Sequence, residues 1–260
     1  MRLHSPTEGS ITFRGVDIFD LKASSNSEYT HNTQIIFQDP YSSLDPRFTV
    51  QQCIEEPLII HRIGTSHERK EKVLSLMKDV GLNPEQLTKF PHEFSGGQRQ
   101  RIGVARALAL KPLLIVCDEP VSALDVSIQA QILNLMQDLQ RKYGLTYLFI
   151  SHNLAVVNHL CDRIIVMYLG NIMEFAEKKA LFSNPLHPYT KGLLDAIPIP
   201  DPEIKTMHTI MRGDVPSPRN PPSGCVFRTR CPIAEKICAE IKPEQREIEP
   251  GHFVACHMVK

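Results

Sequence analysis

The chain has 260 residues, with 29 basic and 29 acidic side chains and a formal net charge of zero. Zero net charge provides no overall field that would favour nucleic acid or an acidic membrane surface. The longest apolar runs, such as LLIVC from Leu113, are too short to cross a bilayer, and the polar, proline-containing stretch after Met1 does not match a signal peptide. We therefore expect a cytosolic globular protein, made of one large domain or of one domain with a small appendage.

The first elements that the sequence predicts are two short strands in EGSITFRGVDIFDL, on either side of a turn at Arg14-Gly15. A polar segment then leads to the apolar run QIIF and to the segment QDPYSSLDP. A helical block is expected over residues 50–94. Within it Thr65 and Glu68 match a capping box, and the apolar residues that follow repeat at helical spacing.

Apolar runs and helical patterns alternate in the next part of the chain. LLIVC is followed by the amphipathic pattern SIQAQILNLMQDLQRKYG, then by TYLFISH, then by DRIIVMYLGNIMEF, which reads strand, turn, strand. Alternating strands and helices favour an α/β fold with a mostly parallel sheet. The runs lack polar alternation, which is typical of strands covered on both faces.

The composition changes at Asn184. Prolines recur from Pro185 to Pro222, and they exclude long helices and central strands from this part of the chain. We therefore expect a first domain over residues 1–183 and a C-terminal extension over residues 184–260 that ends in a small cysteine-bearing module.

Three predicted strands end in chemically active side chains. QIIF leads through Phe37 to Gln38, LLIVC ends at Asp118 and Glu119, and YLFIS ends at His152. Ligands of open α/β sheets bind outside the carboxyl ends of the strands, so one crevice can receive all of these groups. Asp118 is placed to hold Mg²⁺ through water, and Glu119 to orient or deprotonate an attacking water. The alternative is an acidic pair in a solvated turn.

The stretch EFSGGQRQRIGVARAL from Glu93 predicts a phosphate-binding helix start. Ser95 is a plausible N-cap, and Gly96-Gly97 let the backbone approach a ligand closely. A helix beginning near Gln98 would direct its free N–H groups and its dipole at that ligand. The alternative is an ordinary glycine-assisted helix start.

These motifs, taken together, resemble those of ABC-type ATPases. FSGGQ from Phe94 resembles their signature motif, LLIVCDEP their Walker B strand with a catalytic glutamate at Glu119, and FQDP from Phe37 their Q-loop. SALD, which ends at Asp125, resembles the D-loop, and His152 the switch histidine. The longer stretches DEPVSALDVSIQAQILNLMQDLQ, NPLHPYTKGLL and NPPSGCVFRTRCPIA resemble ATP-binding subunits of oligopeptide and dipeptide importers, most of all the oligopeptide F-type subunit.

The resemblance implies a P-loop NTPase-like fold with a helical subdomain, and ATP and Mg²⁺ as cofactors. It implies that two ATPase subunits, identical or different, meet head to tail, so that each ATP lies between the Walker A loop of one and the signature motif of the other. The signature residues would therefore serve the ATP of the partner, and the remaining motifs the chain's own site. The first group is Ser95, Gly96, Gly97 and Gln98; the second is Gln38, Asp118, Glu119 and His152, with Asp125 in the D-loop.

The implied partners beyond the second ATPase are two membrane-spanning permease subunits, reached by the helical block, and indirectly a peptide-binding protein. No nucleic acid is implied, and the implied location is peripheral, on the cytoplasmic face of the membrane. The function expected is that of an ATP-binding subunit that energises peptide import. A non-transport ABC protein is the second hypothesis, but tandem ATPase domains and long coiled-coil insertions are not seen in this sequence.

One motif of the family is not found. No G-x-x-x-x-G-K-[ST] sequence occurs in the 260 residues. The resemblance places the Walker A loop upstream of SPTEGSITFRG, so that Met1 would fall inside the intervening helix, and we therefore expect an N-terminally truncated ATPase. This leaves a third hypothesis, a catalytically incompetent chain that can only donate its signature motif to a partner.

The cysteines divide into two sets. Cys53, Cys117 and Cys161 lie in apolar segments and are expected to be buried free thiols. Four more crowd the C-terminus: Cys225, Cys231, Cys238 and Cys256. Structural disulfides are not expected in a cytosolic protein, and the spacing is not the C-x₂-C pairing of zinc sites. Two interpretations remain, free thiols or a [4Fe–4S] cluster, which four thiolates suit and which some of the resembling proteins bind.

Overall fold

The computed structural model describes residues 4–21, 23–197, 211 and 213–259. It divides into two compact units, Met1–His152 and Asn153–Lys260. The boundary between the units lies at residues 152/153, whereas the sequence indicated a division at 183/184, where the composition changes. The assignment of residues 1–183 and 184–260 to separate domains stays a prediction.

The first unit contains a hairpin and a parallel sheet. In the hairpin, β1 (Thr12–Phe13) pairs with β2 (Val16–Asp17), and Arg14 and Gly15 take positive φ angles of 53° and 81° in the predicted turn. The sheet has the order β3-β4-β5, with all strands parallel. Its strands are β3 (Thr33–Ile36), β4 (Leu114–Asp118) and β5 (Thr146–Ile150). The predicted strands and their parallel pairing are therefore confirmed.

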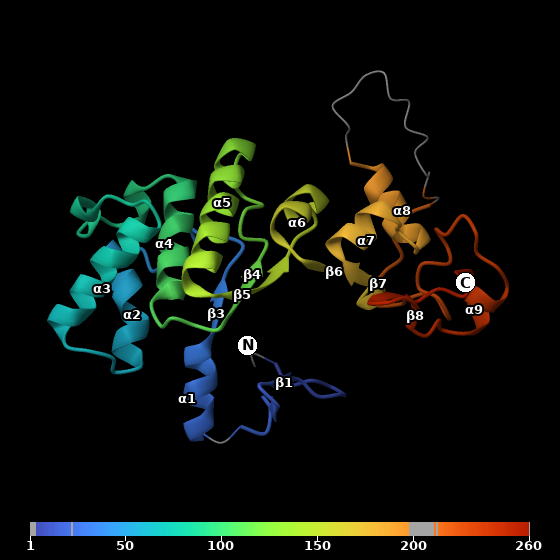
Figure 1. Cartoon of the computed structure of the whole chain (residues 1–260), viewed down its shortest axis with the longest axis horizontal. Coiled ribbons are helices and arrows are strands. Elements are labelled where there is room, and N and C mark those ends of the chain that lie inside the picture. The colour runs from blue at the N-terminus through green and yellow to red at the C-terminus, as the bar shows by residue number, and fades with distance from the viewer. Residues whose placement is uncertain (1–3, 22, 198–210, 212, 260) are drawn as a thin grey trace. The chain divides into compact units, whose positions relative to one another are not determined.

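Helices make up the rest of the first unit (Figure 1). They are α1 (Ala23–Asn32), α2 (Val50–Ile60), α3 (Ser66–Asp79), α4 (Gly96–Leu108) and α5 (Val126–Tyr143), with short 3₁₀ turns η1 (Pro84–Gln86) and η2 (Pro91–Glu93). The block predicted over residues 50–94 is thus helical, and α2, α3 and α4 lie side by side in mutual contact. The polar segment before β3 forms α1, a helix that the sequence did not predict.

Side-chain caps explain where these helices begin and end. Thr65 accepts from the backbone of Glu68, and the Glu68 carboxylate accepts from the backbone of Thr65, so the predicted capping box is present. Gly144 closes α5 with a φ of 65°, a left-handed conformation that glycine adopts without strain. These local interactions place the start of α3 and the end of α5.

The second unit is built on a four-stranded antiparallel sheet with the order β6-β7-β9-β8. Its strands are β6 (Arg163–Tyr168), β7 (Asn171–Glu177), β8 (Arg246–Glu249) and β9 (His252–Val254), and its helices are α6 (Leu154–Leu160), α7 (Lys178–Ser183), α8 (Pro188–Asp195) and α9 (Ile237–Glu240). The predicted β6–β7 hairpin is confirmed. All four of these helices are short, and the prolines that recur from Pro185 bear only on α8, since α6 and α7 precede them.

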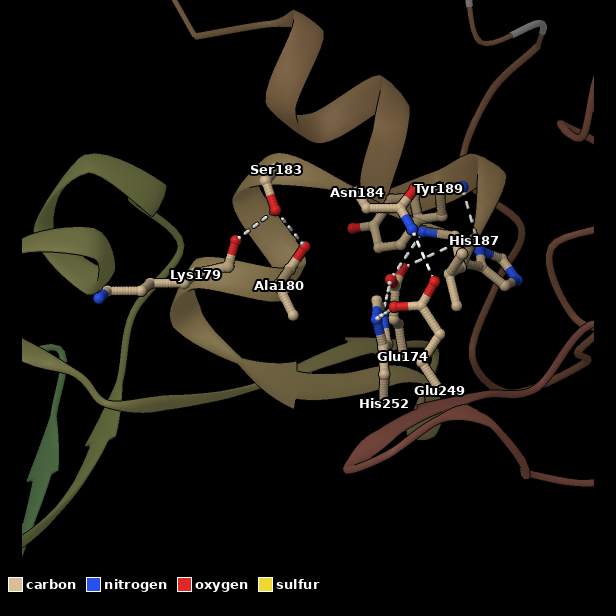
Figure 2. A network of polar contacts seen from close by, with 10 residues as sticks. Glu174, Lys179, Ala180, Ser183, Asn184, His187, Tyr189, Glu249 and His252 are labelled. Carbon is tan, nitrogen blue, oxygen red and sulfur yellow. Dashed lines mark hydrogen bonds and ion pairs between the residues drawn. The ribbon is translucent and has the colours of Figure 1, made fainter.

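A buried polar network ties this sheet to the segment before α8 (Figure 2). The Glu174 side chain, on β7, is 0% exposed and accepts hydrogen bonds from the backbone N–H groups of Leu186 (2.8 Å) and His187 (2.9 Å). The Nε2 atom of His252, on β9, lies 2.7 Å from Glu174 Oε1. Burial lowers the pKa of His187 to about 4, so its ring is neutral at pH 7 and Nδ1 accepts from the N–H of Tyr189. One carboxylate therefore joins three segments of the chain.

In the part of the chain that the structure describes, we find no helix with the length and apolar character of a membrane span.

Candidate functional site

Two of the side chains at the strand ends contact a third, that of Glu119, which directly follows β4. Gln38 Nε2 donates to Glu119 Oε2 over 2.7 Å, and His152 Nδ1 lies 2.9 Å from Glu119 Oε1. A carboxylate accepts hydrogen bonds, so Gln38 Nε2 and His152 Nδ1 are both placed to donate to Glu119. These hydrogen bonds bring Gln38, Glu119 and His152 together at the carboxyl ends of the strands, as expected; their functional roles stay a prediction.

The backbone of Glu119 is held in an uncommon conformation. Its φ is +45°, in the left-handed region that non-glycine residues rarely adopt. Its N–H donates to the carbonyl of Ile150 on β5, and its own carbonyl accepts from the N–H and the hydroxyl of Ser122. Such strain costs about 1–3 kcal/mol and concentrates at functional sites. The strand end is therefore built to present this carboxylate, whose side chain is 22% exposed.

Asp118 lies one residue earlier, as the last residue of β4 and opposite Ile150 in the register with β5. Two carboxylates thus leave the same strand end in succession. Mg²⁺ in nucleotide sites is commonly held by one or two carboxylates together with phosphate oxygens, so Asp118 stays our candidate for that ion.

The signature stretch forms a capped helix start. Ser95 is the N-cap of α4: its hydroxyl accepts from the N–H of Gln98 (3.4 Å), and the Gln98 side chain accepts from the N–H of Ser95 (3.0 Å). The predicted N-cap is confirmed. The helix begins at Gly96 and not near Gln98, however, because this reciprocal capping brings both glycines into the first turn.

Close packing explains the two glycines. A Cβ atom at Gly97 would lie 2.5 Å from Ile128 Cγ2 on α5, and one at Gly96 would lie 3.3 Å from Leu124. The first turn of α4 therefore contacts the segment that enters α5. No sequence pattern could have indicated this, because the contacting residues lie about thirty positions apart.

Replacing Gly97 by alanine is expected to destabilise the fold by about 1–3 kcal/mol, the usual cost of forcing an extra methyl group into a packed site. Urea denaturation would measure it. Gly103→Ala is the matched control, because a Cβ atom on that residue of the same helix meets nothing within 4 Å and should stabilise by about 0.5–1 kcal/mol. An equal stability of the two variants would contradict the packing argument, and Ile128→Ala should rescue Gly97→Ala.

Asp125, in the expected D-loop, is the N-cap of α5. Its carboxylate accepts from the Ser127 hydroxyl (2.7 Å) and from the N–H of Ile128 (3.0 Å), and these hydrogen bonds, with Ser127 first, lower the pKa of Asp125. This anchors the start of α5 beside the signature glycines. We refer to the Asp125–Gly97 neighbourhood and the Gln38–Glu119–His152 group as the two clusters of the first unit.

The C-terminal cysteines gather in the second unit. Cys225, Cys238 and Cys256 are buried, Cys231 is half-buried, and burial raises the pKa of Cys225 and Cys231, with the other cysteines of the set adding to the effect. The N–H of Cys225 donates to the carbonyl of Cys238. Among the described residues, however, no three Cys, His, Asp or Glu side chains are arranged so that they could hold a metal ion.

Comparison with known proteins decides the family. Residues 1–122 match the ABC transporter family model, and residues 173–238 match the model of the oligopeptide/dipeptide transporter C-terminal region. The chain is 55% identical to the putative oligopeptide transport ATP-binding protein YkfD of Bacillus subtilis over 263 residues, which cover all of this chain and 80% of that protein. The chain belongs to the oligopeptide ABC transporter ATP-binding proteins.

Other members and solved structures agree with this membership. The oligopeptide transport ATP-binding protein OppF of Salmonella typhimurium is 52% identical over 96% of this chain and 75% of its own length. A dimer of the ATP-binding cassette MJ0796, bound to ADP and Pi after hydrolysis, superposes with a TM-score of 0.60 at 29% identity, covering 68% of this chain and 76% of that one. CbiO1 of Clostridium perfringens gives 0.63 at 25% identity, with 70% and 71% covered. The predicted ABC ATPase fold and peptide-transport family are confirmed.

Proposed function

We propose that this chain contributes to ATP-driven import of oligopeptides as one of two paired ATPase subunits. The observation that carries the proposal is the meeting of Gln38 and His152 on the strained Glu119. A carboxylate held between an amide donor and an imidazole is suited to orient or deprotonate a water molecule. Proteins of this family use nucleotide. The role that we give to each residue is our proposal.

The two clusters of the first unit would serve different nucleotides. Bound ATP and Mg²⁺ would supply the transferable phosphoryl group and the charge that neutralises it. Glu119 would hold the attacking water, Gln38 and His152 would fix the position of the Glu119 carboxylate, and Asp118 would face the metal. The N-terminus of α4, from Ser95 to Gln98, would present backbone N–H groups to the phosphates of the partner's nucleotide.

We also propose the partners of this chain and its location in the cell. The partners are a second ATPase subunit, identical or different, and two membrane-spanning permease subunits that contact the helical block of α2 and α3. The chain would act peripherally at the cytoplasmic face of the membrane, with a peptide-binding protein as an indirect partner. Ile59 and Ile60, more than half exposed on α2, support a contact surface in this block.

The 260 residues do not include a G-x-x-x-x-G-K-[ST] sequence. Backbone amides and the lysine of that loop provide the main contacts to the β- and γ-phosphates in P-loop enzymes. A segment that carries this loop ahead of these residues would supply those contacts to the site at Glu119.

Ser95→Arg tests the proposal in mixed dimers of this chain with a P-loop-bearing partner subunit. The arginine would fill the space before the α4 N-terminus, and ATP hydrolysis at the partner's P-loop is expected to fall about 100-fold or more, the cost of losing preorganised donors. Steady-state phosphate release measures it. Ser75→Arg, on the exposed face of α3, is the control and should leave the rate unchanged. A normal rate with Ser95→Arg would contradict the head-to-tail arrangement.

We propose that the cysteine module holds a [4Fe–4S] cluster. Four thiols in one loop-rich module are the donor set that such a cluster takes. Their arrangement in this structure does not close a ligand shell, and free thiols are the competing state. Cys225 and Cys238 belong to an apolar cluster around the fully buried Phe227, so an iron–sulfur cluster would add to the folding free energy that this packing already supplies.

Anaerobically purified protein is expected to be brown and to contain about four iron atoms per chain. Cys231→Ser should bleach it, because a ligand is lost, whereas Cys161→Ser, also in the second unit but outside the set, should not. Elemental analysis and the visible absorption spectrum measure both. Colourless protein without iron, in which the four thiols react with a thiol reagent once the protein is unfolded, would establish the free-thiol state instead.

A further inference from the structure

The segment after Gln38 is a closed turn that contacts the signature helix. Within it, the Asp39 carboxylate accepts from the N–H of Tyr41 (2.8 Å), and the N–H of Ser43 donates to the carbonyl of Asp39 (3.2 Å). The second of these hydrogen bonds joins the ends of residues 39–43, and the first closes residues 39–41 within that turn. We call residues 39–45 the tethered segment.

Arg99 makes the first contact from α4. Its Nε donates to the carbonyl of Phe94, directly before Ser95, over 2.9 Å, and its guanidinium carbon lies 4.8 Å from the ring centroid of Tyr41. One side chain thus touches both the entry to the signature helix and the tethered segment. Tyr41 is 61% exposed, and a cation–π contact at an exposed position is weak, so this contact can open and close.

Arg106 makes the second contact. Its Nη1 donates to the carbonyl of Ser43 over 2.6 Å in a part-buried position. A charged donor at that distance makes a stronger hydrogen bond than a neutral one, and partial burial protects it from water. Arg99 and Arg106 are seven residues apart, about two helical turns, so both lie on the same face of α4.

We propose that Arg99 and Arg106 are positioning residues that link Gln38 to the signature motif within one subunit. Arg106 is a fixed attachment of the tethered segment to α4, and the Arg99–Tyr41 contact is one that can be released. Movement of Gln38 towards or away from Glu119 would then reach Ser95 through the tethered segment and α4. The inference rests on the proposed roles of Gln38 and Ser95, but the linkage itself can be measured without nucleotide or partner.

Hydrogen exchange followed by mass spectrometry tests the linkage. Arg99→Gln is expected to raise exchange in residues 39–45 about two- to fivefold, which corresponds to the loss of an exposed cation–π contact. Arg106→Gln is expected to raise it tenfold or more, because a hydrogen bond from a charged group is lost. Arg101→Gln is the matched control: Arg101 is on the same helix but donates to the carbonyl of Val80, and should leave this segment unchanged.

Hydrogen exchange at residues 94–98 in variants of Tyr41 distinguishes a positioning role of Arg99 from a purely structural one. Tyr41→Leu and Arg99→Gln should both raise hydrogen exchange at residues 94–98. Tyr41→Phe should keep the native rate, because it keeps the aromatic ring. The double variant of Tyr41→Leu with Arg99→Gln should exchange as fast as either single variant. Unchanged exchange at residues 94–98 in Tyr41→Leu would overturn the inference. Failure of the proposed function would appear elsewhere, as a normal partner-site rate with Ser95→Arg.

Discussion

Glu119→Gln is expected to reduce ATP hydrolysis by at least about 100-fold in a protein that carries a P-loop segment ahead of these residues. General-base assistance of this kind contributes about 10²–10⁴-fold. The amide keeps the shape of the side chain and can still contact Gln38 and His152, so ATP binding should remain within a few-fold. Single-turnover hydrolysis and nucleotide titration together separate the two effects.

Glu71→Gln is the control for this variant. The Glu71 carboxylate is exposed on α3, where it pairs with His67 of the same helix. Glu71→Gln should leave both hydrolysis and binding unchanged. Equal losses of binding and turnover in Glu119→Gln would mean that Glu119 holds the site together and does not act on water.

Glu174→Gln is expected to destabilise the second unit by about 3–5 kcal/mol. Removing one partner of a buried ion pair or charged network leaves the other polar groups unsatisfied. A glutamine amide cannot accept from the backbone N–H groups of Leu186 and His187 and from His252 at once, since one of its two ends is a donor. Urea unfolding followed by circular dichroism measures the loss.

The matched control is Glu249→Gln, in the same network (Figure 2). This carboxylate is 51% exposed and accepts from the Asn184 side chain over 3.1 Å. Its change should cost less than about 1 kcal/mol, as is usual for exposed polar contacts. Similar losses of unfolding free energy in both variants would show that the contribution of Glu174 to stability does not depend on its burial.

Local signals in the sequence determined most elements of the first unit. The caps at Thr65, Ser95 and Gly144 use side chains and backbone within four residues, and short apolar runs mark the strands, so both are visible in the residue order. The rule that parallel strands expose their carboxyl ends at one edge was enough to predict that Gln38, Glu119 and His152 meet. The family motifs supported the same group.

Only the tertiary structure decided the features that depend on partners far away in the chain. Gly97 is required by Ile128 on another helix, Glu174 is buried by β9 and the segment before α8, and Arg99 lies on a tyrosine that precedes it by 58 residues (99 − 41). No periodicity in the residue order carries such pairings, because packing and burial are set by the whole fold and not by neighbouring side chains. The sequence by itself therefore indicated which groups to propose for the chemistry, and the fold decided how they are held.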